Sequence, residues 1–144
     1  GNGADVFAEF EDCVFVIEVR LSESSGQEAM EGEPVRRHVA DLMQQYSKPV
    51  YGLFIANRID SNTAETFRIG IWYTKTDEKL NLHIVPFTLA QFSAFFKTIF
   101  SVGCVAPKKV IDLISECEKY RYECEAPAWK RAISQVVALQ CCTV

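Results

Sequence analysis

The sequence has few features of a cross-linked, membrane-spanning or unstructured protein. Its six cysteines form no Cys-x-x-Cys pair and no framework spacing, which favours reduced, mostly buried thiols in a cytosolic protein. No apolar run approaches the roughly 18–20 residues that span a bilayer, and we expect no signal peptide from the first residues. Repeats and linker-like stretches are also missing. A chain of 144 residues with 49% apolar and 24% charged residues is therefore predicted to be one globular domain with its own core.

The chain also lacks an excess of positive charge. It has 19 acidic and 15 basic residues, a formal charge of −4, which at first sight argues against a nucleic-acid partner. The charge is unevenly spread, however. Residues 1–33 hold nine acids and one base, so residues 34–144 hold 10 acids and 14 bases. A segment with a net charge of −8 thus precedes a remainder with a net charge of +4. This asymmetry indicates that the acids have a role of their own.

Hydrophobic periodicity predicts an α/β domain with a central mixed sheet flanked by helices and a helical C-terminal third. We expect strands at 6–10, 13–21, 50–56 and 80–85, with 50–56 buried on both faces as a central strand. We expect helices at 27–46, 60–73, 88–100, 107–124 and 127–141. Two alternatives stay open: Pro34 suits a helix that begins only near Glu33, and the alternation over 67–72 also fits a strand.

The first two strands form a hairpin if Glu11 and Asp12 make its turn, and Asp5 then lies opposite Glu18. Alternation gives this hairpin one wholly apolar face and places Asp5, Glu18 and Arg20 on the other. Directly paired like charges destabilise a sheet unless something compensates for them. The pair therefore indicates either a divalent-metal site or two carboxylates that share a proton.

The following helical segment adds polar groups that face the same way. Gln27, Glu31 and His38 share a helical stripe with apolar residues, and Glu31 would be a third acid near the pair. Arg36 and Arg37 supply positive charge of the kind that binds phosphates. Carboxylates suit Mg²⁺, so the pattern predicts a metal site that cleaves phosphodiesters, with the cations neutralising developing charge.

Structural roles are open for the same residues. Glu18 could be an exposed strand residue beside Arg20, and His38 is first interpreted as a hydrogen-bonded core histidine. Gln27 could cap a helix, while the Arg36 and Arg37 pair is usually a solvated face that can direct at most one side chain to a site. His83 has no partner at metal-ligand spacing.

At these residues the sequence resembles a known group of nucleases. Asp5 and the Glu18-Val-Arg20 strand resemble the PD-(D/E)xK nuclease core. The block from Gln27 to His38, followed by the segments at 53–56, 59–67 and 84–89, is similar to the cleavage domain of the AlwI-type restriction endonucleases, a type IIS group. The element order is also similar to the FokI cleavage domain. The resemblance covers residues 3 to about 96, and residues 104–144 carry no motif that we can place.

The resemblance implies Mg²⁺-dependent hydrolysis of double-stranded DNA, with Mn²⁺ as a substitute ion. It implies that Asp5 and Glu18 are metal ligands, that Glu31 is a further catalytic acid, and that Gln27, Arg37 and His38 support the site or bind phosphate. It also implies a bacterial cytoplasmic enzyme, a separate DNA-recognition domain and a dimer with a second nuclease domain. We accordingly expect residues 1–144 to be one cleavage domain of a longer protein.

Two residues depart from the family pattern. Ala4 replaces a frequent proline, which should be harmless, and Arg20 occupies the lysine position. Arginine stays protonated, so it can stabilise a phosphate in the transition state but cannot act as a general base. Two other functions therefore stay open: a repair or defence nuclease on the same fold, and an inactive scaffold or dimerisation module. The scaffold function is supported by an apolar stripe made of Trp129, Ile133, Val136 and Val137, which could be core or interface.

Overall fold

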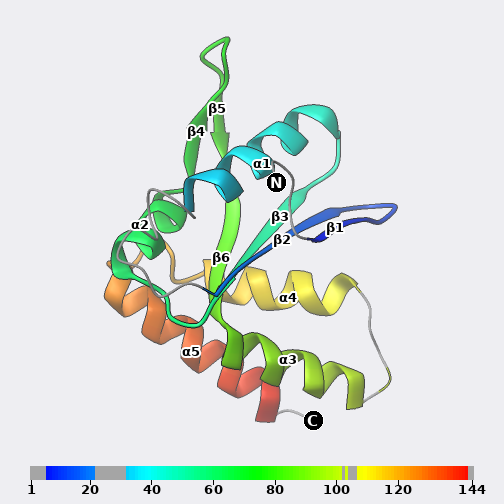
Figure 1. Cartoon of the computed structure of the whole chain (residues 1–144), viewed down its shortest axis with the longest axis vertical. Helices are drawn as coiled ribbons and strands as arrows, with labels where there is room; N and C mark the ends of the chain where they lie inside the picture. Colours follow the sequence, from blue (N-terminus) through cyan, green and yellow to red (C-terminus); the bar gives the residue numbers. More distant parts are fainter. Residues whose placement is uncertain (1–5, 22–31, 102, 104–106, 143–144) are drawn as a thin grey trace.

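The computed structural model describes residues 6–21, 32–101, 103 and 107–142 (Figure 1). The strands of this part are β1 (Val6–Glu9), β2 (Val14–Arg20), β3 (Val50–Ala56), β4 (Ile71–Tyr73), β5 (Lys79–Asn81) and β6 (His83–Thr88). Its helices are α1 (Glu33–Gln45), α2 (Ser61–Ile69), α3 (Leu89–Ser101), α4 (Pro107–Glu118) and α5 (Ala126–Cys142). The predicted α/β class, with a central mixed sheet and a helical C-terminal third, is confirmed.

The main sheet has the strand order β1-β2-β3-β6. β1 is antiparallel to β2, whereas β2, β3 and β6 run parallel to one another. The register Val6↔Ile17 and Ala8↔Phe15 confirms the predicted hairpin. Asp5, the proposed partner of Glu18, lies outside the described residues. The carboxyl ends of three parallel strands consequently meet at one edge of the sheet, the usual place for ligands in α/β folds.

Helices cover both faces of this sheet (Figure 1). On one face, α1 approaches β3 so closely that a β-carbon on Gly52 would lie 2.9 Å from Val39 Cγ2. On the same face, Phe67 of α2 packs on Phe54 with ring centroids 5.2 Å apart. α3 and α4 cover the opposite face, and α5 packs against α2, α3 and α4. Glycine at position 52 therefore sets how closely the first helix lies on the sheet.

Several predicted boundaries were wrong, and long-range contacts explain them. The predicted helix 60–73 ends at Ile69, because Gly70 adopts a left-handed conformation with φ 57°, and β4 follows. The predicted strand 80–85 is divided between β5 and β6, which belong to different sheets. Leu82, between them, donates its N–H to Gly70 O at 2.7 Å. α4 ends at Glu118 rather than at 124, and the described part of the first helix begins at Glu33.

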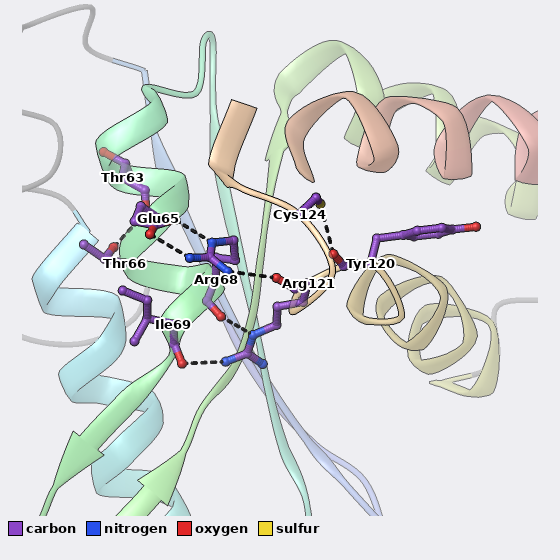
Figure 2. A network of polar contacts seen from close by, with 8 residues as sticks. All are labelled: Thr63, Glu65, Thr66, Arg68, Ile69, Tyr120, Arg121 and Cys124. Atoms are coloured by element: carbon purple, nitrogen blue, oxygen red, sulfur yellow. Dashed lines mark hydrogen bonds and ion pairs between the residues drawn. The ribbon is translucent and has the colours of Figure 1, made fainter. Parts of the chain in front are cut away.

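The segment after α4 is fixed to α2 by a buried arginine (Figure 2). Arg121, 1% exposed, donates to Arg68 O at 2.6 Å and to Ile69 O at 3.2 Å. It also forms an ion pair with Glu118 at 2.8 Å. Three groups thus compensate the burial of this charge, and they hold the C-terminal helices against the end of α2.

The apolar stripe on α5 belongs to the core. Its four members are all buried, and they are Trp129, Ile133, Val136 and Val137. Of the two roles open for this stripe, core or interface, the structure shows the core role. Within the described part, no helix is long and apolar enough to cross a membrane. Cys13 and Cys117 are buried free thiols, as predicted, whereas Cys124 and Cys141 are partly exposed.

Candidate active site

Glu18 is a buried carboxylate in the carboxyl half of β2, with 1% of its side chain exposed. It follows the apolar run that builds this strand, and it pairs laterally with Phe54 of β3. Among the described residues it is the one acid that is buried. The interpretation of Glu18 as an exposed strand residue is therefore wrong. A carboxylate removed from water requires cationic or hydrogen-bonding partners, and two basic side chains meet it here.

The first partner is His38, whose Nδ1 lies 2.6 Å from Glu18 Oε1. α1 places it there because Val35 and Val39, on the same helix, are buried against the sheet. In this hydrogen bond the Nδ1–H tautomer of His38 is the donor to an ionised Glu18. The side chain of His38 is 13% exposed. His38 thus points toward the sheet, as its helical spacing predicts. Its imidazole also makes a hydrogen bond, as the interpretation of His38 as a core histidine requires.

The second partner is Arg20, two residues along the same strand and on the same face of the sheet. Its Nη2 lies 3.0 Å from Glu18 Oε2, and its Nη1 donates to Val19 O at 3.0 Å. The side chain is 28% exposed, so the guanidinium lies between the buried carboxylate and solvent. A permanently charged donor at this edge can contact an anionic ligand from solvent while it neutralises Glu18.

The described contacts of Arg37 do not include Glu18, Arg20 or His38. Its side chain is 49% exposed and forms an ion pair with Glu33, one helical turn earlier, at 3.2 Å. Arg36 donates to Ile71 O at 2.7 Å and stacks over the ring of Trp72. The supporting role of Arg37 stays a prediction, and the observed contacts are those of a solvated helix face.

Asp5, Gln27 and Glu31 lie outside the described residues, so the structure places only part of the predicted site. Within the described ranges, no group of three His, Cys, Asp or Glu side chains could hold a metal ion. Glu18 nevertheless has the chemistry that Mg²⁺ requires, because it is an oxygen donor at the solvent edge of a parallel sheet. Glu18 thus fits a metal site that needs further carboxylates from residues 1–5 and 22–31.

A pocket of about 390 Å³ opens at the same edge of the sheet and was not predicted from the sequence. Its lining includes three basic residues, Arg58, Lys130 and Arg131. Arg58 lies two residues after the end of β3, and the other two lie on α5, in a segment without a recognisable motif. The one sequence signal was the pair of adjacent bases on α5, which share a helix face with Pro127 and Ser134.

Comparisons with known proteins agree with this fold. A family model described as AlwI restriction endonuclease matches residues 1–95. The chain belongs to the AlwI restriction endonuclease family. The AlwI-family chain is also similar in structure to the small subunit of the heterodimeric restriction endonuclease R.BspD6I, with a TM-score of 0.73 and 22% identity over 96% of this chain and 69% of that one. A comparison with curated proteins gives no match. The structural likeness includes the C-terminal helices, which the family match does not reach.

Proposed function

We propose that this chain is a metal-dependent endonuclease domain that hydrolyses phosphodiester bonds of double-stranded DNA, as the cleavage part of a type IIS restriction enzyme. The observation that carries the proposal is the buried Glu18 between Arg20 and His38, in a chain of the AlwI restriction endonuclease family. A buried acid that two bases hold at the solvent edge of a parallel sheet is expensive to build for stability alone. It is therefore a candidate for chemistry.

In this proposal Glu18 and Asp5 would hold Mg²⁺, with Glu31 as a further acid of the PD-(D/E)xK type. When bound, the ion would neutralise charge at the phosphoryl group and lower the pKa of a coordinated water. His38 would fix the direction of the Glu18 carboxylate through its 2.6 Å hydrogen bond. Arg20 would donate to a phosphate oxygen, since a guanidinium cannot accept a proton at neutral pH.

DNA recognition would require another part of the enzyme. A separate recognition domain and a second nuclease subunit are the proposed partners, because the structurally similar chain is the small subunit of a heterodimeric enzyme. The net charge of +4 over residues 34–144 is small for tight duplex binding alone. A repair or defence nuclease on the same fold would use the same residues, but the family match favours restriction.

The test is nicking of supercoiled plasmid by the purified chain with Mg²⁺ or Mn²⁺. Glu18→Gln should lower the nicking rate about a hundredfold or more, because it removes a proposed metal ligand. Glu118→Gln is the matched control, since Glu118 also contacts a histidine, His83, and an arginine, Arg121, but on the opposite face of the sheet. Equal nicking by wild type and Glu18→Gln would contradict the proposed role of Glu18, and nicking by both proteins only at the background rate would leave an inactive scaffold as the function.

A further inference from the structure

The pocket at the sheet edge is well suited to an anion. Arg58, Lys130 and Arg131 line it together with the polar side chains of Gln91 and Ser134, and none of its described lining residues carries a carboxylate. Lys130 Nζ donates to Ile59 O at 3.0 Å, which directs the ammonium group and leaves further N–H donors. The basic lining thus belongs to a surface whose remaining polar groups are neutral.

The neutral polar groups are held in place by hydrogen bonds. Gln91 N donates to Thr88 Oγ1 at 3.1 Å and Thr88 N donates to Gln91 Oε1 at 2.9 Å, which is a capping box at the start of α3. Gln91 Nε2 donates to Ser134 Oγ at 2.8 Å, so the hydroxyl of Ser134 can donate its own proton outward. Hydroxyl and helix N-terminal donors beside cations are the usual surroundings of a bound phosphate.

The sheet register relates this pocket to the candidate active site. Thr88, in the pocket lining, pairs with Ala56, and Ala56 pairs with Arg20. Residues paired laterally in a sheet point to the same face, and neighbouring strands are about 4.8 Å apart. Thr88 and Arg20 therefore lie on one face of the sheet, with their backbones roughly 10 Å apart. A DNA strand that reaches Arg20 can thus place another of its phosphates at the pocket.

We propose that this pocket binds a backbone phosphate of DNA near the bond that is cut. The proposal rests on the proposed function, because it takes DNA as the substrate of the neighbouring candidate active site. Lys130 and Arg131 would neutralise the phosphate charge, and Ser134 would donate a hydrogen bond to it. Contacts of this kind position a duplex without reading its sequence. The C-terminal helix would thus contribute to substrate binding as well as to the core.

Fluorescence anisotropy with a labelled 20-base-pair duplex, in metal-free buffer over a range of NaCl concentrations, tests the pocket. Lys130→Gln/Arg131→Gln should weaken binding about tenfold at low salt, to a similar degree for unrelated sequences. It should also reduce the slope of log K against log salt by about 0.9 for the lost phosphate contact. Arg131→Gln alone keeps the Lys130 hydrogen bond to Ile59, so we expect this variant to fold normally. A reduced slope in this variant then reports on the lost charge.

Lys108→Gln/Lys109→Gln on α4 is the control for net charge, because it removes two charges from the opposite face of the sheet. Equal weakening by the two double variants, or no salt-dependent binding by wild type, would overturn the phosphate site. Tighter binding of a deoxynucleoside monophosphate than of the duplex would assign the pocket to a free ligand and overturn the backbone assignment. Plasmid nicking with Mg²⁺ reports on the proposed function separately, since an inactive chain can still show the pocket-dependent slope.

Discussion

Gly70 joins α2 to β4 at a point where the backbone, Arg121 and Leu82 meet. Its φ of 57° is a left-handed conformation that costs side-chain-bearing residues about 1–2 kcal/mol. A β-carbon there would overlap the guanidinium of Arg121 and would lie 2.9 Å from Leu82 O. The absence of a side chain at this position is therefore what allows a buried arginine to reach the carbonyls at the end of α2.

Gly70→Ala should lower the free energy of unfolding by about 3 kcal/mol or more, because backbone strain adds to the loss of hydrogen bonds to buried carbonyls. Urea denaturation measures the difference. Gly103→Ala is the matched control, since Gly103 also has a positive φ, 69°, but its β-carbon would meet no atom of the described residues within 4 Å. It should cost only the strain, about 1–2 kcal/mol. Equal losses would mean that the Arg121 contacts add nothing to stability.

Single residues of the candidate site could be predicted where a local pattern determines their direction. Strand alternation placed Glu18 and Arg20 on one face, and helical spacing directed His38 to that face. The burial of Glu18 could not be predicted, since it depends on α1 lying over β2. Arg121 and the basic pocket could not be predicted either, because they bring together segments that are far apart in the sequence, 53 residues in the contact between Arg121 and Arg68.

At the scale of elements, capping decides where α2 begins. Asp60 Oδ2 accepts from the N–H groups of Asn62 at 3.1 Å and Thr63 at 3.3 Å. These are two of the first donors of the helix, which have no carbonyl partner within it. The start of this helix was predicted to within one residue, whereas the end of α2 was not, because the end depends on the contact between Gly70 and Leu82.

Asp60→Ala should lower the free energy of unfolding by about 1 kcal/mol, because both N–H groups lose their acceptor. Thermal denaturation followed by circular dichroism measures this change. Asp60→Asn keeps an acceptor oxygen and should cost much less than the alanine variant. If the two variants are equally destabilised, charge rather than the hydrogen bonds stabilises the start of the helix.

At the scale of the whole molecule, the C-terminal helices complete the core. Their buried apolar side chains include Leu113, Ile114, Trp129 and Ile133. Each contributes roughly 1.5–3 kcal/mol by burial, and the sum is comparable with the total stability of a domain, about 5–15 kcal/mol. The family match, which ends at residue 95, therefore stops short of the folding unit.

A chain ending at residue 103 should consequently show no cooperative unfolding transition and rapid digestion by trypsin. Two point variants on α5, one buried and one exposed, serve as controls for the loss of stability. Ile133→Ala should cost about 2–5 kcal/mol, because Ile133 is 1% exposed, whereas Leu139→Ala, at a position 67% exposed, should be nearly neutral. A cooperative melt of the shortened chain would show that the sheet folds without α4 and α5.

The position of α5 also affects the order of events during synthesis. Ribosomes release the N-terminal strands and their acidic residues first, but the face that α5 packs against stays uncovered until the last helix has been made. The proposed phosphate pocket includes Lys130 and Arg131, so it is completed only after α5 has emerged. A polypeptide that stops before α5 would accordingly lack this pocket.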